Sequence, residues 1–227
     1  MPSFAQRAIS AIRGGRVISV IKRRLARRYL RRCKGVIHVG ANDGAERDTY
    51  ARHGLRVLWV EPLPDAFSIL QTNIAAYDGQ EAVRALITDR DGDEHVLHVS
   101  NIAGLCSSIL SPQGITEILP HVQFTDRITL TSTTLPTIMR ERDMSLYDAL
   151  VIDTQGAELL VLRGAASILH HFNCIECEGA DFEVYAGYPS PGEIRAFLAD
   201  HGFRQIREDT FRHSEQGREF DMLFCRG

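Results

Sequence analysis

A glycine-rich turn is the first feature of this chain that can do chemistry. It follows a short apolar run, in the segment Val36-Ile37-His38-Val39-Gly40-Ala41-Asn42-Asp43-Gly44. Glycine adopts backbone conformations that side chains forbid and allows the backbone to approach a ligand closely. The spacing fits neither the Gly-x-Gly-x-x-Gly dinucleotide pattern nor a P-loop, because no lysine follows. The segment predicts a buried strand that runs into a ligand-binding turn, with a purely structural turn as the alternative.

Three carboxylates each follow a short apolar run that is typical of a strand. They are Glu61, Asp153 and Glu178. In an open parallel sheet, ligands bind beyond the carboxyl ends of the strands. Glu61 stands about twenty residues after the glycine turn, the distance typical of an acid that binds a ribose. Together these features predict a nucleoside ligand, and they leave both NAD and S-adenosylmethionine open.

The elements that must position these groups alternate between strand and helix patterns from residue 35 onward. This alternation predicts a mostly parallel sheet with helices on both faces. Strands are expected at residues 35–39, 55–60, 82–87, 149–152 and 172–177, and a terminal antiparallel hairpin at 203–207 and 219–225. Helices are expected at residues 45–53, 64–77, 157–170 and 191–201.

A less regular stretch interrupts this alternation between residues 94 and 133. Two strand-like segments, 94–100 and 127–133, enclose residues 102–121, which are rich in Ser, Gly and Pro. Long loops inside a compact domain are usually functional. We therefore expect this loop to cover the substrate or the cofactor.

The residues around the second strand-end acid, Asp153, resemble the FkbM family of methyltransferases. The most specific segments are Asp153-Thr154-Gln155-Gly156-Ala157-Glu158 and Val161-Leu162-Arg163-Gly164-Ala165. The resemblance spans residues 35–209 and includes the glycine turn, Val60-Glu61-Pro62, Ser107-Ser108-Ile109-Leu110, Tyr185-Ala186-Gly187 and His201-Gly202-Phe203. The chain departs from the family pattern at His38 and at Pro136, where many relatives carry Asp.

The resemblance implies a Rossmann-like class I methyltransferase fold of the α/β class. Its seven-stranded, mostly parallel sheet carries helices on both faces and ends in an antiparallel hairpin, and it binds S-adenosyl-L-methionine. The glycine turn would face the methionine part, Glu61 the ribose, Leu86 the adenine and Asp153 the sulfonium. The implied cofactor-binding residues are Gly40, Ala41, Asn42, Asp43, Gly44, Glu61, Pro62, Leu86, Ser107 and Asp153.

The chemistry of a sulfonium methyl donor predicts what the protein must add. The methyl group is already electrophilic, so the protein aligns an oxygen nucleophile and offers a general base. Asp153 and Glu178 are the catalytic candidates, with His38 and His121 in reserve. The alternative is that Asp153 only positions the cofactor and Glu178 only binds a loop amide. No metal is expected, because Thr154-Gln155-Gly156 replaces the usual acidic cluster.

The resulting functional hypothesis is O-methylation of a hydroxyl, on a sugar, glycan or secondary metabolite. A small-molecule or glycan acceptor is therefore the expected partner. One alternative, an NAD(P)-dependent oxidoreductase, is disfavoured by the glycine spacing and by the lack of a Tyr-x-x-x-Lys pair. Another alternative is a non-catalytic nucleoside-binding module on the same fold.

The first part of the chain differs sharply in charge from the rest. Residues 1–34 contain eleven of the 26 lysines and arginines, and the first carboxylate is Asp43. This segment is interpreted as separate from the methyltransferase domain at 35–227. Residues 5–33 fit a basic amphipathic helix that contacts an anionic membrane surface, or else a solvated appendage; nucleic acid is not expected.

Compartment is inferred from targeting patterns and cysteines. Arginines interrupt every apolar stretch near the N-terminus, and no run is long enough to span a membrane. The five cysteines are an odd number, and Cys174-x-x-Cys177 lacks a second pair at zinc spacing. These features predict a cytoplasmic, reducing location, with membrane association through the basic segment, and no metal or redox role for the cysteine pair.

Overall fold

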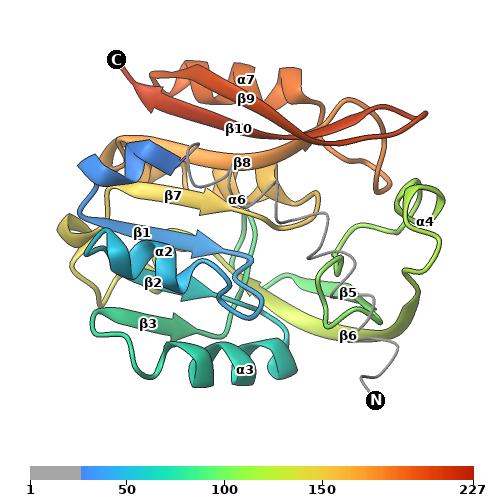
Figure 1. The fold of residues 1–227 in the computed structure, drawn as a ribbon, viewed down its shortest axis with the longest axis horizontal. Helices are drawn as coiled ribbons and strands as arrows, with labels where there is room; N and C mark the ends of the chain where they lie inside the picture. Colours follow the sequence, from blue (N-terminus) through green and yellow to red (C-terminus); the bar gives the residue numbers. More distant parts are fainter. Residues whose placement is uncertain (1–26) are drawn as a thin grey trace.

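A seven-stranded sheet forms the centre of the computed structural model, which describes residues 27–227 (Figure 1). Its strand order is β3-β2-β1-β7-β8-β10-β9. Neighbours from β3 to β8 are parallel, whereas β10 is antiparallel to both β8 and β9. The strands are β1 (Gly35–Val39), β2 (Arg56–Val60), β3 (Gln80–Val83), β7 (Ala149–Ile152), β8 (Cys174–Ala180), β9 (Phe203–His213) and β10 (Arg218–Arg226). The predicted fold class and terminal hairpin are confirmed.

Helices cover both faces of the sheet and bury its central strands completely. Every residue of β1 and β7 is buried, as expected for parallel strands between two helical layers. One face packs against α2 (Arg47–Arg52), α3 (Pro64–Ile74) and the short helix η1 (Arg27–Arg32). The other packs against α5 (Leu135–Met139), α6 (Glu158–Gly164), η3 (Ala166–His171) and α7 (Pro191–Asp200).

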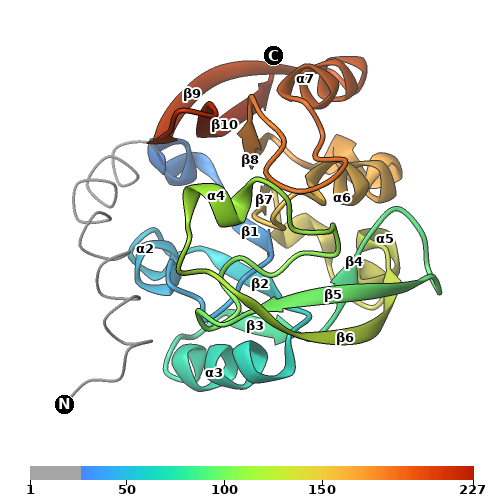
Figure 2. The same cartoon turned by 90° about the vertical axis from the view of Figure 1, so that its right-hand side faces the viewer.

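A second, three-stranded sheet lies outside the main one, in the order β4-β6-β5. It consists of β4 (Leu86–Ile87), β5 (Glu94–Ser100) and β6 (Phe124–Thr133). In Figure 2 the carboxyl ends of the parallel strands face the viewer, and this sheet lies in front with α4 (Ile115–Ile118). We name residues 101–123, which connect β5 and β6, the insertion loop.

Three predicted elements need correction. The strand expected at 82–87 is split, because residues after Val83 leave the main sheet and Leu86 pairs with Ser132 on β6. The strand expected to end at Cys177 continues to Ala180, where it pairs with Glu219 of β10. The helix expected at 157–170 becomes α6 followed by the tighter η3, with the break at Gly164 where β4 and its turn approach closely. An added Cβ at Gly164 would lie 2.2 Å from the backbone oxygen of Thr88.

A disulfide joins Cys174 on β8 to Cys225 on β10, whose Cα atoms lie 4.2 Å apart as directly paired residues. Reduced cysteines are expected from the sequence, whereas disulfides are typical of oxidising compartments. This pair therefore departs from that expectation. Cys177 is a free, buried thiol, so the two cysteines of the Cys-x-x-Cys segment, Cys174 and Cys177, are not bonded to each other.

The start of the described chain packs directly onto the domain. Leu30 of η1 is fully buried and shares a hydrophobic cluster with Val36 and Tyr50. The rest of the helix expected at residues 5–33 lies outside the described residues. Within residues 27–227, no helix has the length and apolar character needed to cross a membrane.

Candidate active site

The glycine turn joins the ends of three strands. Gly40 follows β1 with a φ of +83°, and a Cβ added there would lie 1.8 Å from the backbone oxygen of Asp153 after β7. The amides of Gly40 and Ala41 both donate to the carbonyl of Val60 on β2, at 2.9 and 3.1 Å. Only glycine fits this position. The glycine turn therefore lies in direct contact with the backbone of Asp153, the strand-end acid of β7.

Glu61 is held below the glycine turn by backbone amides. Its side chain accepts hydrogen bonds from the amides of Asn42 at 2.7 Å and Leu63 at 2.9 Å, and only 4% of the residue is exposed. Burial raises the pKa of Glu61 to about 7, an effect that the two amides oppose and the charge of Asp153 reinforces. A carboxylate offers about four acceptor positions. Two therefore remain for hydroxyl hydrogens, which is the arrangement a ribose requires.

The remaining turn residues fasten this loop to its surroundings. Asn42 has a φ of +46°, and its side-chain amide donates to the carbonyl of Ala103 in the insertion loop at 2.9 Å. The carbonyl of Asp43 accepts from the side chain of Asn73 on α3 at 2.7 Å. Gly44 has a φ of +68°. The turn is therefore fixed between α3 and the insertion loop, as a preorganised cradle should be.

The two predicted catalytic carboxylates are brought together by one amide. The side-chain nitrogen of Gln155 lies 2.8 Å from Asp153 Oδ1 and 3.2 Å from Glu178 Oε2. Asp153 follows β7 directly, and its amide donates to the carbonyl of Val39 at 2.9 Å. Glu178 lies inside β8, two residues before its last residue, Ala180, instead of at its tip. Gln155 was not among the predicted site residues, although it stands inside the family motif.

Glu158 shapes the turn that carries Gln155. It is fully buried, and one oxygen accepts from the amides of Thr154 and Gly156 at 3.0 and 3.1 Å and from the Thr154 hydroxyl. Burial raises the pKa of Glu158 to about 7. The second oxygen has no hydrogen-bond partner. Glu158 therefore stabilises the backbone turn between β7 and α6.

Other predicted residues lie in less direct positions. Ser107 accepts a hydrogen bond from the amide of Ser100 at 3.0 Å, so it braces the insertion loop. Pro62 follows Glu61 in the link between β2 and α3. Leu86 is buried in β4, in the second sheet instead of at the end of a main-sheet strand.

The two histidines held in reserve do not join the strand-end acids. His38 is buried, its ring stacks on Trp59 with centroids 5.0 Å apart, and its Nδ1 lies 3.1 Å from the hydroxyl of Tyr50. These aromatic partners belong to the core under α2. His121 is exposed on the insertion loop. Packing, which sequence alone does not reveal, explains the position of His38.

The insertion loop is bound firmly to the segment that follows β8. Its base is closed by a bond between the amide of Asn101 and the carbonyl of Gln123, at 2.9 Å. Apolar side chains from both segments form a separate small core, made of Ile102, Cys106, Ile115, Val122, Ala180, Val184 and Tyr185. The loop is therefore an ordered cover at the carboxyl edge of the sheet.

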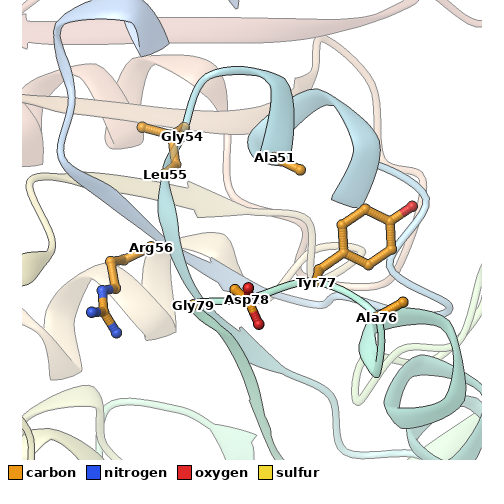
Figure 3. A pocket seen from close by; sticks show the side chains of 8 residues that line it. All are labelled: Ala51, Gly54, Leu55, Arg56, Ala76, Tyr77, Asp78 and Gly79. Atoms are coloured by element: carbon orange, nitrogen blue, oxygen red, sulfur yellow. The ribbon is translucent and has the colours of Figure 1, made fainter.

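Two further features of the described residues bear on the site. Between residues 27 and 227, no group of three or more His, Cys, Asp and Glu side chains is arranged to hold a metal ion. A surface pocket of about 390 Å³ opens at the amino ends of β2 and β3, at the edge opposite the strand-end acids (Figure 3). It is lined by Ala51, Gly54, Leu55, Arg56, Ala76, Tyr77, Asp78 and Gly79.

Comparison with known proteins places this geometry among methyltransferases. A family model described as the Methyltransferase FkbM domain matches residues 38–205. The chain is 28% identical over 160 residues to the 2-O-methyltransferase NoeI of Sinorhizobium fredii. That match covers 67% of this chain and 65% of the relative, so the chain spans slightly less than two thirds of that protein's length.

Solved structures share the fold at low sequence identity. Magnesium protoporphyrin IX methyltransferase (ChlM) from Synechocystis PCC 6803 with bound SAH has a TM-score of 0.53 and 13% identity, covering 100% of this chain and 89% of that chain. The M. capricolum TrmK complex with S-adenosyl-homocysteine has a TM-score of 0.50 and 7% identity, covering 85% and 62%. At these identities the likeness concerns the fold alone.

Proposed function

This chain belongs to the FkbM methyltransferase family, and from that premise we propose that it is an S-adenosylmethionine-dependent O-methyltransferase acting on a hydroxyl of a sugar, a glycan or a secondary metabolite. One observation carries the proposal: a buried strand-end carboxylate, Glu61, lies under a glycine turn that touches Asp153. The name of the relative NoeI, a 2-O-methyltransferase, supports oxygen as the acceptor atom.

The residues present fit the cofactor. Glu61 retains acceptor positions for the ribose hydroxyls, and Gly40 keeps the turn free of side-chain atoms. When bound, S-adenosylmethionine supplies a methyl group made electrophilic by the sulfonium. The carboxylate of Asp153, which follows β7 directly, would stabilise that positive charge.

Asp153 and Glu178 supply what the acceptor needs. Both carboxylates lie within hydrogen-bond reach of the Gln155 amide nitrogen, so they face a common space. One orients the acceptor hydroxyl by accepting its hydrogen bond, and it takes the proton as the oxygen gains the methyl group. The insertion loop covers this edge and limits the access of water.

The charge of the site supports a neutral acceptor group. Two carboxylates share one amide, and a nearby anion on the acceptor would be repelled by both. Like charges placed together cost several kcal/mol. The hydroxyl that is methylated therefore belongs to a neutral part of the acceptor, such as an unmodified sugar ring.

Transfer of a labelled methyl group tests this function. With tritiated S-adenosylmethionine, we expect methylation of a neutral methyl hexoside at least about tenfold faster than of the matching methyl hexuronide, because the uronate carboxyl is repelled. The two acceptors share the hydroxyls at C2, C3 and C4 and differ only at C6, so each serves as the other's control for transfer to these three positions. Preference for the uronate, or transfer to neither across a panel of such pairs, would contradict the proposal.

Peripheral contact with an anionic membrane surface is a further part of the proposal. It is supported by the basic and apolar pattern of residues 5–33. In the described part, Arg31, Lys34 and Arg52 are exposed. Burial lowers the pKa of His53, and the positive charges of Arg31 and Arg52 lower it further. These cations gather at the amino ends of the strands, away from the acidic site.

Vesicle sedimentation tests the membrane contact. Each basic residue near an anionic surface contributes about 1 kcal/mol, so reversing three charges with Lys22→Glu, Arg23→Glu and Arg24→Glu should weaken binding to phosphatidylserine vesicles by at least about 100-fold. Phosphatidylcholine vesicles are the control and should bind neither protein. Equal sedimentation of the variant and the wild type would rule out this contact.

A further inference from the structure

Gln155 holds an unusual backbone conformation. Its φ is +55°, and that of the next residue, Gly156, is +107°. A positive φ is uncommon for a residue other than glycine, and it persists where the surroundings impose it. Here Glu158 accepts the flanking amides, and the hydroxyl of Ser108 donates to the carbonyl of Gln155 at 2.7 Å. The main chain at Gln155 is therefore fixed independently of its side chain.

Both ends of the Gln155 side chain are used. The nitrogen contacts Asp153 and Glu178, as described, and one amide NH₂ group can give one hydrogen to each carboxylate. The oxygen faces the hydroxyl of Tyr185 at 3.2 Å. Because the carboxylates are acceptors, this orientation of the amide is the one that satisfies all contacts.

Tyr185 extends the network into the insertion loop. It is 1% exposed, and its single hydroxyl proton is shared between the carbonyl oxygen of Cys106 at 2.9 Å and Gln155 Oε1 at 3.2 Å. Burial raises the pKa of Tyr185 well above its usual value, so the hydroxyl keeps its proton. A continuous chain of hydrogen bonds thus runs from the two site carboxylates, through Gln155 and Tyr185, to the backbone of the insertion loop.

We infer that Gln155 is a positioning residue that couples the paired carboxylates to the insertion loop and keeps this loop closed over the site. The functional meaning of the site rests on the proposed function, whereas the coupling is a property of the chain itself. Closure of the loop and the spacing of the two acids are then set by the same side chain. Removing the amide should loosen the loop without removing the ribose-binding residue Glu61.

Hydrogen exchange in the free protein tests the coupling. In Gln155→Met, which has a similar length and no amide, we expect peptides within residues 102–112 to exchange about tenfold faster, because the hydrogen bonds to Asp153, Glu178 and Tyr185 are lost. Tyr185→Phe breaks the same chain one step further on and should give a similar acceleration. The matched control is Gln113→Met, which removes an exposed bond from the same loop to Glu183 and should change exchange less than about twofold.

Binding of S-adenosylhomocysteine, measured on the same samples, separates this inference from the proposed function. Faster exchange of residues 102–112 in both variants would support the coupling, whatever affinity the variants keep for S-adenosylhomocysteine. Unchanged exchange of residues 102–112 in folded Gln155→Met, or in Tyr185→Phe if the first variant does not fold, would overturn it. Failure of every sample to bind S-adenosylhomocysteine would contradict the proposed function alone, because exchange requires no ligand.

Discussion

Gly40→Ala is expected to destabilise the native fold more than an ordinary glycine substitution does. The new Cβ would lie 1.8 Å from the backbone oxygen of Asp153, and the φ of +83° is strained for any side chain. The contact is with backbone at the junction of β1, β2 and β7, so no flexible group can move aside. We expect a loss above about 4 kcal/mol in the free energy of unfolding, the range of exceptional substitutions. Chemical denaturation of the soluble protein measures it.

Gly54→Ala is the matched control for this substitution. Gly54 also has a positive φ, +66°, but nothing lies within 4 Å of an added Cβ. Only the conformational cost remains, roughly 1–2 kcal/mol. If Gly40→Ala were no more destabilising than Gly54→Ala, the close junction of the three strands would be wrong.

Glu61→Gln should weaken the binding of S-adenosylhomocysteine by at least about 100-fold. Both oxygens of Glu61 accept backbone amides, so an amide NH₂ would face another donor at Asn42 or Leu63. The same change removes the charge that strengthens hydrogen bonds from the ribose, each worth about 1.5–3 kcal/mol. Calorimetry measures the affinity, with Glu81→Gln as the control because Glu81 lies on the surface beside Arg142.

The pH dependence of binding follows from the raised pKa of Glu61, about 7. The ionised carboxylate of Glu61 accepts hydrogen bonds from the ribose hydroxyls. Below pH 7 the carboxyl group is protonated, and it must lose this proton before the ligand binds. The affinity of the wild type should therefore fall by up to about tenfold per pH unit below 7, and the affinity of Glu61→Gln should not. A parallel pH dependence in the two proteins would show that another group is responsible.

The sequence predicted the features that depend on neighbouring residues. The glycine turn and the acids Glu61 and Asp153 follow apolar runs directly, and the structure has β1, β2 and β7 at those places. Short local patterns specify a parallel strand and its end because such strands are buried on both faces. The family resemblance is confirmed by the family model over residues 38–205.

The features that sequence analysis missed depend on distant pairings. β8 is extended by β10, which places Glu178 inside a strand, and Cys174 bonds a residue 51 positions away. The second sheet requires β4 to leave the main sheet for β6. Gln155 becomes part of the site only because Glu178 and Tyr185 converge on it from later segments. No periodicity in the sequence carries this information.

Calorimetric titration of the wild-type protein with S-adenosylhomocysteine and, separately, with NAD tests the central claim most directly. The account predicts saturable one-to-one binding of S-adenosylhomocysteine and no detectable heat with NAD, because the glycine turn and Glu61 form a nucleoside site in a chain of the FkbM methyltransferase family. Binding of NAD in preference to S-adenosylhomocysteine, or of neither, would contradict it.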